Sequence, residues 1–223
     1  MSAIFETMRV REGRIPLLAR HLTRLQQSAA VLGLPRPSAI IGEIALERAA
    51  AGPTDHVLRL GWSGEGTAWT DRELGRLVPQ RLVTVGIPHG PYPLKSEDRL
   101  PFDRALAEAE RVGGTEPLLL TPAGMIAETA RWAILWMEGD VLRYPAADLG
   151  VLPSIGLGRV LELAADLGMA ASAVRAPRRA LEARPAWLVN AVRGLVPIEA
   201  LDGEGLPPSK ALREVARAFW PAA

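Results

Sequence analysis

Apolar and polar residues repeat along the first part of the chain with the periods of both strands and helices. Apolar residues at every second position predict strands, and apolar residues about three or four positions apart predict helices. These patterns predict a strand, two helices and a second strand, in chain order, over residues 4–10, 16–32, 38–51 and 56–63. In the second strand, alternation places Leu58 and Leu60 on one face and Arg59 on the other.

A less regular polar stretch over residues 67–80 follows, and we expect a domain boundary within it, near 72–79. Beyond the boundary, helices are expected over residues 101–112, 154–168 and 209–220, with Ser154 placed to cap the second of them. Strands are expected between the helices, over residues 81–88, 116–121, 125–130, 132–137, 187–194 and 195–201.

Strands and helices therefore mix without a regular βαβ alternation, which favours an α+β fold over a doubly wound sheet. We expect two domains. The first is a small α/β domain over residues 1–77, and the second is a larger, β-rich α+β domain over residues 78–223 that carries Lys95.

Composition narrows the class of protein. Apolar residues make up 48% of the chain, charged residues 23%, and the net charge is +1 with both signs interspersed, so nothing favours nucleic acid as a partner. No apolar run is long enough for a membrane span and the N-terminus is too polar for a signal peptide, so we expect a cytoplasmic protein. There is no cysteine, and the three histidines lack metal-ligand spacing, so no metal site is expected.

Lysine is rare in this chain and is therefore informative. Of the 26 lysine and arginine residues only Lys95 and Lys210 are lysines, and Lys210 lies in the predicted terminal helix. Arginine keeps its proton near neutral pH, whereas a desolvated lysine can lose it and act as an amine in Schiff-base chemistry. Lys95 is thus a candidate for covalent catalysis, although a plain surface lysine is the alternative.

Three more features would suit a phosphate-bearing aldehyde cofactor. Glu128 is a carboxylate between apolar residues, Arg59 is a cation on a strand, and the glycines of Ser154–Gly158 would let an anion approach the start of a helix. Each also has a plainer interpretation. Glu128 and Arg59 could be exposed strand residues, and the turn could be an ordinary helix entry.

Six segments carry a resemblance to a known family, and they are FETMRVREGRIPLLARHLTRL, VLRLGWSGEG, LKSEDRL, EPLLLTPAGMIAETARWAILW, GVLPSIGLGRVLELAADLG and WLVNAVRGLVPI. Together they resemble the class IV aminotransferases, the pyridoxal-phosphate enzymes of fold type IV. The last segment is most similar to the aminodeoxychorismate lyase branch.

The resemblance implies a two-domain fold like that of D-amino acid aminotransferase, a pyridoxal 5'-phosphate cofactor, a small amino substrate and a homodimer. It places the catalytic Schiff-base role on Lys95. Cofactor-binding roles fall on Arg59, Lys95, Glu128, Ser154, Ile155, Gly156, Asn190 and Ala191. Weaker candidates for contact with the substrate are Phe5, Arg9, Arg99 and Arg193.

The chain departs from the family pattern at several positions. Family members usually carry a further strand and a G-D-G turn first, so we expect an N-terminally short version of the architecture. Ser154 and Gly156 replace the phosphate-binding glycine and threonine, and Ala133 replaces an asparagine. Restoring the hydroxyl through Gly156→Thr is expected to tighten cofactor binding by about 1–2 kcal/mol.

The sequence favours a lyase that converts 4-amino-4-deoxychorismate to 4-aminobenzoate and pyruvate for folate synthesis. One alternative is a branched-chain or D-amino acid aminotransferase on the same scaffold. Another is a degenerate family member that does not catalyse.

Overall fold

The computed structural model describes residues 3–221, and its contacts divide them into two compact units. The first unit extends to Arg76 and also includes Leu94–Asp98, and the second comprises Leu77–Pro93 and the chain from Arg99 onward. None of the helices in this described part is both long and apolar enough to cross a membrane.

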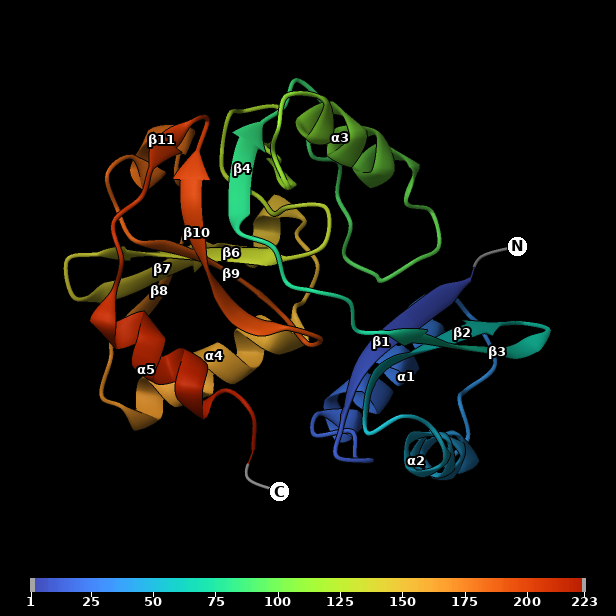
Figure 1. The fold of residues 1–223 in the computed structure, drawn as a ribbon. Helices are drawn as coiled ribbons and strands as arrows, with labels where there is room; N and C mark the ends of the chain where they lie inside the picture. Colours follow the sequence, from blue (N-terminus) through green and yellow to red (C-terminus); the bar gives the residue numbers. More distant parts are fainter. Residues whose placement is uncertain (1–2, 222–223) are drawn as a thin grey trace. The chain divides into compact units, whose positions relative to one another are not determined.

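A three-stranded antiparallel sheet with two helices makes up most of the first unit (Figure 1). Its elements are β1 (Ile4–Arg11), α1 (Leu18–Val31), α2 (Ile40–Ala51), β2 (Asp55–Ser63) and β3 (Gly66–Glu73). The two strands and two helices predicted here are confirmed. The irregular stretch predicted from residue 67 is wrong, because β3 pairs with β2 along its whole length. Its sequence gives little sign of a strand because both faces of β3 are largely exposed and polar.

The sheet of the first unit has one apolar face and one polar face. Ile4 and Met8 of β1 and Leu58 and Leu60 of β2 belong to a buried cluster with residues of α1 and α2. Alternation turns Arg59 to the opposite face, as predicted.

A buried ionic cluster interrupts the apolar face. Glu6 of β1 is 1% exposed and receives hydrogen bonds from α1, at 2.6 Å to His21 Nδ1 and at 2.6 and 2.7 Å to Arg24 Nη2 and Nε. Burial alone would raise the pKa of Glu6, but the charge of Arg24 and the hydrogen bond from His21 outweigh it and lower this pKa from 4.5 to about 2. The cluster thus ties α1 to β1 through an ionised carboxylate.

The short segment Leu94–Asp98 adds to the free edge of β1. Phe5 N donates to Lys95 O at 2.9 Å, and Ile4 and Ser96 form an antiparallel bridge. Lys95 therefore packs with the first unit, which differs from the expected division that placed it in the second domain. Backbone pairing across some ninety residues of sequence is the cause, and no local pattern reports it.

The second unit is built around an eight-stranded mixed sheet in the order β5-β4-β10-β9-β6-β7-β8, with β11 beside β10. Its strands are β4 (Gln80–Thr84), β5 (Glu116–Leu118), β6 (Ala133–Glu138), β7 (Val141–Pro145), β8 (Ala171–Val174), β9 (Ala186–Asn190), β10 (Gly194–Leu201) and β11 (Glu204–Gly205). Its helices are α3 (Leu100–Arg111), α4 (Ile155–Asp166) and α5 (Lys210–Ala218), with short 3-10 turns at Ala147–Leu149 and Arg178–Leu181.

Most predicted elements of this unit are confirmed, including the three helices. The strand predicted over residues 125–130 is wrong. That segment is extended and makes isolated bridges, as at Ile126 with Leu120, so Glu128 lies on a hydrogen-bonded loop and not on a strand. Strand β8 was not predicted, because it is short and alanine-rich.

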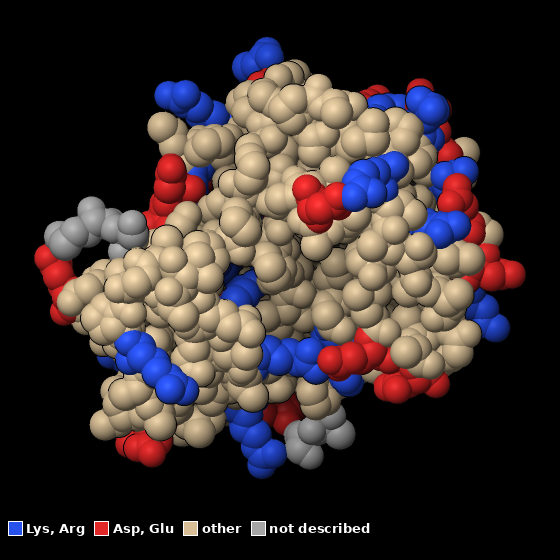
Figure 2. Space-filling view, turned by 180° about the vertical axis from the view of Figure 1, so that it is seen from behind, with Lys and Arg blue, Asp and Glu red and all other residues tan. Residues whose placement is uncertain are grey.

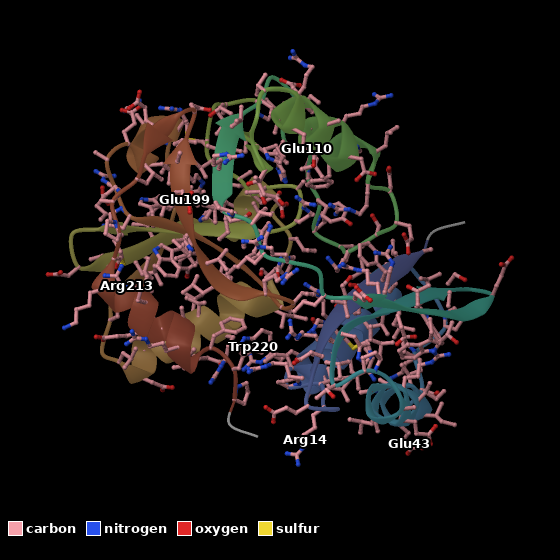
Figure 3. The ribbon with its side chains drawn as sticks, viewed as in Figure 1. Arg14, Glu43, Glu110, Glu199, Arg213 and Trp220 are labelled. Carbon is pink, nitrogen blue, oxygen red and sulfur yellow. The ribbon has the colours of Figure 1, made fainter. Side chains whose placement is uncertain are left out.

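Charged residues lie on the exposed faces of the helices, for example Glu43 on α2, Glu110 on α3 and Arg213 on α5 (Figure 3). On the face drawn in Figure 2, basic and acidic side chains lie beside one another with uncharged surface between them. A large buried apolar cluster of the second unit includes Ile134, Trp136 and Leu188.

The buried cluster around Glu6 predicts an effect of pH on stability. The folded pKa of Glu6 lies below its ordinary value of 4.5, so its stabilisation is complete above that value and is lost as pH falls toward about 2. We expect Glu6→Gln to lower the free energy of unfolding by about 3 kcal/mol near neutral pH, because it leaves the partly buried Arg24 without its counter-charge. Urea titrations followed by circular dichroism, at neutral and acidic pH, measure this.

The difference between wild type and Glu6→Gln should shrink as pH falls below about 4.5. Glu47→Gln is the matched control, because Glu47 is exposed on α2 of the same unit and should change stability by less than about 0.5 kcal/mol. A difference for Glu6→Gln that stays constant across the pH range would contradict the account.

Candidate active site

Two cations lie at one aromatic ring in the first unit. Lys95 Nζ is 4.6 Å from the centroid of the Phe5 ring, and Arg59 Cζ is 3.6 Å from the same centroid. Phe5 is 3% exposed, and its N–H holds the carbonyl of Lys95. A strand residue thus fixes the lysine backbone and packs against both cations, which draws together Phe5, Arg59 and Lys95 as the sequence suggested.

Besides burial, the positive charge of Lys95 contributes to lowering the pKa of His21, which belongs to the buried ionic cluster. Burial is the largest cause that lowers the pKa of His21, and the positive charges of Arg24 and Lys95 add to it, while Glu6 opposes them. His21 Nε2 is buried without a hydrogen-bond partner within the described residues, which agrees with a neutral ring. Lys95 therefore stands near a network that is already charge-balanced.

Arg59 carries an ion pair that the sequence did not reveal. Its Nη2 donates to Glu97 Oε2 at 2.6 Å, and both side chains are partly exposed, at 34% and 45%. Glu97 follows Lys95 by two residues, and its approach to Arg59 depends on the pairing of Leu94–Asp98 with β1. An anion that binds Arg59 would meet the charge of Glu97 there.

In the second unit, Glu128 is a buried carboxylate with a fixed orientation. It is 7% exposed, and its Oε1 accepts hydrogen bonds from His89 Nε2 at 2.9 Å and from Leu152 N at 3.2 Å. Within residues 3–221, both hydrogen bonds to this carboxylate end on Oε1, so Oε2 keeps its lone pairs. No pattern in the sequence assigns a role to His89, because only its tertiary contact with Glu128 identifies it.

The start of helix α4 has backbone N–H groups that lack a partner within the helix. Ser154 is its N-cap, as predicted, and Ser154 Oγ accepts from Leu157 N at 3.2 Å. The backbone N–H groups of Ile155 and Gly156 belong to the first turn, where a helix offers no partner of its own. The hydroxyl of Ser154 is engaged by the cap, so the free donors of this turn are backbone groups.

Gly156 lies against the end of strand β9. A Cβ on Gly156 would stand 2.9 Å from the carbonyl carbon of Asn190 and 2.9 Å from Val189 Cγ2, closer than real Cβ contacts come. The expectation that Gly156→Thr improves the site is therefore wrong, because there is no room for a side chain. Glycine here brings the turn after β9 beside the start of α4.

The side chain of Asn190 stabilises the turn that follows it through hydrogen bonds. Its Oδ1 accepts from Val192 N at 3.0 Å and from Arg193 N at 2.8 Å, and its Nδ2 donates to Arg131 O at 3.3 Å. These bonds hold the Asn190–Arg193 turn, which contains Ala191, against Gly156. A cofactor role for Asn190 and Ala191 remains a prediction, and for Asn190 it would pass through the backbone.

The four residues suggested for the substrate are already engaged. Arg9 pairs with Asp55 at 2.8 Å, and Phe5 is covered by the two cations. Arg99 donates to Ala130 O and stacks on Tyr92 and Phe102, with its Cζ 5.6 and 4.6 Å from their ring centroids. Arg193 is half-buried at the Asn190 turn. Their substrate roles stay predictions.

Comparison with known proteins gives the family. The sequence profile of "Amino-transferase class IV" matches residues 3–201 of this chain. The chain belongs to the class IV aminotransferase family, whose members are pyridoxal-phosphate enzymes with the α+β fold predicted from the sequence.

Individual relatives agree with this assignment. A bifunctional aminodeoxychorismate lyase / D-amino acid transaminase of Mycobacterium tuberculosis is 27% identical over 244 aligned residues, which cover 92% of this chain and 83% of the relative. A crystal structure of a proposed 4-amino-4-deoxychorismate lyase is 26% identical, with a TM-score of 0.86 and coverage of 100% and 91%. The branched-chain aminotransferase of Thermoproteus uzoniensis has the same fold, with 22% identity, a TM-score of 0.90 and coverage of 98% and 84%.

The residues present suit pyridoxal phosphate. Glu128 Oε2 could pair with a ring nitrogen, the backbone N–H groups of the α4 turn could bind a phosphate, and Lys95 could supply an amine. Glycine at position 156 is the strongest structural sign of this fit. It keeps the start of α4 in contact with the Asn190 turn, whereas a Cβ would separate them. Within the described residues, no three His, Cys, Asp or Glu side chains are grouped to hold a metal ion.

The close packing of Gly156 yields a prediction on stability. We expect Gly156→Ala to lower the free energy of unfolding by about 1–3 kcal/mol, because the added Cβ must push α4 away from β9. Gly86→Ala in the same unit is the control, since the nearest atom to its Cβ would be 3.8 Å away. Urea unfolding of both variants measures this, and equal stability of Gly156→Ala and wild type would show that the contact is not tight.

Proposed function

We propose that this protein is a pyridoxal-phosphate-dependent lyase that converts 4-amino-4-deoxychorismate to 4-aminobenzoate and pyruvate. The observation that carries the proposal is the placement of Lys95, the lysine outside the terminal helix, which β1 holds beside Arg59. The name of the Mycobacterium tuberculosis relative, which includes aminodeoxychorismate lyase, is consistent with this activity. The resemblance of WLVNAVRGLVPI to the lyase branch points the same way.

The chain's own residues would divide the work. Lys95 Nζ would hold the cofactor and, once released, remove the proton from the substrate carbon that bears the amino group. Glu128 Oε2 would face the ring nitrogen and keep it protonated. The N–H groups of Ile155 and Gly156 would bind the phosphate, and the family resemblance also gives Arg59 a cofactor-binding role.

Pyridoxal phosphate held by these residues would supply an electron-withdrawing ring, which would make the proton that Lys95 Nζ removes more acidic. The bond between the substrate ring and the oxygen of its enolpyruvyl group then breaks, and the departing enolate takes up a proton to become pyruvate. The remaining ring becomes the aromatic 4-aminobenzoate, which makes the step favourable. Lys95 Nζ is the group that carries the proton.

A D-amino acid transaminase is the second candidate, because the same relative carries that activity in its name. It differs in needing a second, keto-acid substrate in the same site. Together with the lyase activity we propose a homodimer, which the family resemblance implies. A place in folate synthesis follows from the proposed reaction, and a cytoplasmic location is the expectation from the composition of the sequence.

Product analysis separates the two activities. Purified holoenzyme given 4-amino-4-deoxychorismate should release 4-aminobenzoate, detected by its fluorescence, in step with pyruvate. Lys95→Ala should abolish release because the amine is lost, and Lys210→Ala should not change it because Lys210 begins the terminal helix. Keto-acid formation from D-amino acids without 4-aminobenzoate would overturn the lyase in favour of the transaminase.

The pair of Arg59 and Glu97 predicts how tightly the phosphate is held. We expect Glu97→Gln to tighten binding of pyridoxal 5'-phosphate by about fivefold, or ~1 kcal/mol, because a neighbouring negative charge is removed. Pyridoxal, which has no phosphate, should bind both proteins equally. Fluorescence titration of apoprotein measures both ligands.

Asp98→Asn is the matched control for this titration. It removes the same charge from an exposed neighbour in the same segment, and it should leave the affinity for pyridoxal 5'-phosphate within about twofold. Weaker phosphate-dependent binding by Glu97→Gln would mean that Glu97 holds Arg59 in place for the cofactor and does not compete with it.

A further inference from the structure

His89 is the buried histidine of the second unit and has no part in the family pattern. It is 3% exposed, it follows strand β4 in a proline-rich loop, and its Nε2 lies 2.9 Å from Glu128 Oε1. We propose that His89 is a positioning residue, which holds Glu128 so that Oε2 is presented to the ring nitrogen of the cofactor. The inference rests on the proposed role of Glu128.

Two donors fix a single oxygen of the carboxylate. His89 Nε2 and Leu152 N both lie within hydrogen-bond distance of Glu128 Oε1, at 2.9 and 3.2 Å. Two N–H groups on one oxygen prevent the carboxylate from rotating without loss of a bond, and a buried lost bond is costly. The orientation of Oε2 follows from that of Oε1, so His89 determines it at a distance.

The loop that carries His89 is itself anchored at two points. His89 N donates to Leu120 O at 2.7 Å, and Tyr92 N donates to Gly150 O at 2.7 Å. Gly150 has a φ of +77°, and a Cβ on it would stand 2.9 Å from Pro91, so only glycine lets the loop pass this closely. These anchors give the imidazole a rigid base, as a positioning role requires.

The hydrogen bonds of His89 are those expected of a neutral imidazole that donates to Glu128 through Nε2. His89 Nδ1 is buried without a partner within residues 3–221. A neutral ring with its proton on Nε2 leaves only an acceptor unmatched, whereas a protonated ring would bury an unmatched charged N–H. A neutral donor orients the carboxylate but does not neutralise it, so its full charge can act on a cationic ring nitrogen.

The test uses holoenzyme loaded with pyridoxal 5'-phosphate labelled with ¹⁵N at the ring nitrogen. The ¹⁵N chemical shift reports directly whether that nitrogen is protonated. We expect a protonated shift in wild type and in His89→Gln, whose amide Nε2 can replace the imidazole donor. His89→Phe keeps ring volume but lacks the donor, and its shift should move toward the unprotonated value, in the direction of Glu128→Gln.

Turnover should follow the same order. We expect His89→Phe to lower kcat by about tenfold to a hundredfold, the effect of one hydrogen bond to a charged group, and His89→Gln to recover most of it. His89→Phe should cost little more once Glu128→Gln is present, because both act through one carboxylate. Phe102→Leu is the packing control, since Phe102 contacts His89 edge to face at 6.4 Å yet gives Glu128 no donor, and its ¹⁵N shift should stay as in wild type.

The outcomes separate this inference from the proposed function. If Glu128→Gln does not move the ¹⁵N shift, the role of Glu128 fails, and the inference fails with it. If Glu128→Gln moves the shift but His89→Phe does not, only the inference is overturned. Should His89→Phe fail to fold, His89→Met replaces it, and a ¹⁵N shift that is the same in His89→Met and wild type overturns the inference.

Discussion

The hydrogen bond from Phe5 N to Lys95 O is the contact on which the candidate site depends. It adds Leu94–Asp98 to the edge of β1 and so places the amine of Lys95 at the ring of Phe5, where Arg59 also lies. The strand that provides this edge is anchored to α1 by the buried carboxylate of Glu6. Strand β1 therefore contributes to two features: its backbone positions Lys95, and its residue Glu6 forms the buried ion cluster with α1.

In the second unit, the corresponding feature is the buried carboxylate of Glu128, which hydrogen-bond donors hold in one orientation. A carboxylate that is to act on a ring nitrogen must be buried enough to exclude water and still keep its charge, so donors must replace the lost solvent. His89 and Leu152 N supply them at one oxygen of Glu128. Because Leu152 closely precedes the start of α4, the same hydrogen bond connects Glu128 to the first turn of that helix.

Local patterns in the sequence predicted much of the fold. The amphipathic helix over residues 16–32, the Ser154 cap and the alternation that turns Arg59 from the core depend only on nearby residues, and all are found. The features that escaped prediction arise from distant contacts. Strand β3 is polar on both faces, Lys95 joins β1 across the chain, and His89 and Glu97 have partners known only from the fold. The space at Gly156 is likewise set by Asn190, which no local pattern could reveal.

Chemical mapping of the cofactor tests the central claim most directly. Holoenzyme reduced with borohydride and digested should yield one pyridoxyl-labelled peptide, detected by mass spectrometry, with the label on Lys95. The account predicts this because β1 holds Lys95 beside Arg59, whereas Lys210 begins the terminal helix α5. A label on Lys210, or protein that binds pyridoxal phosphate without forming any reducible bond, would contradict the account.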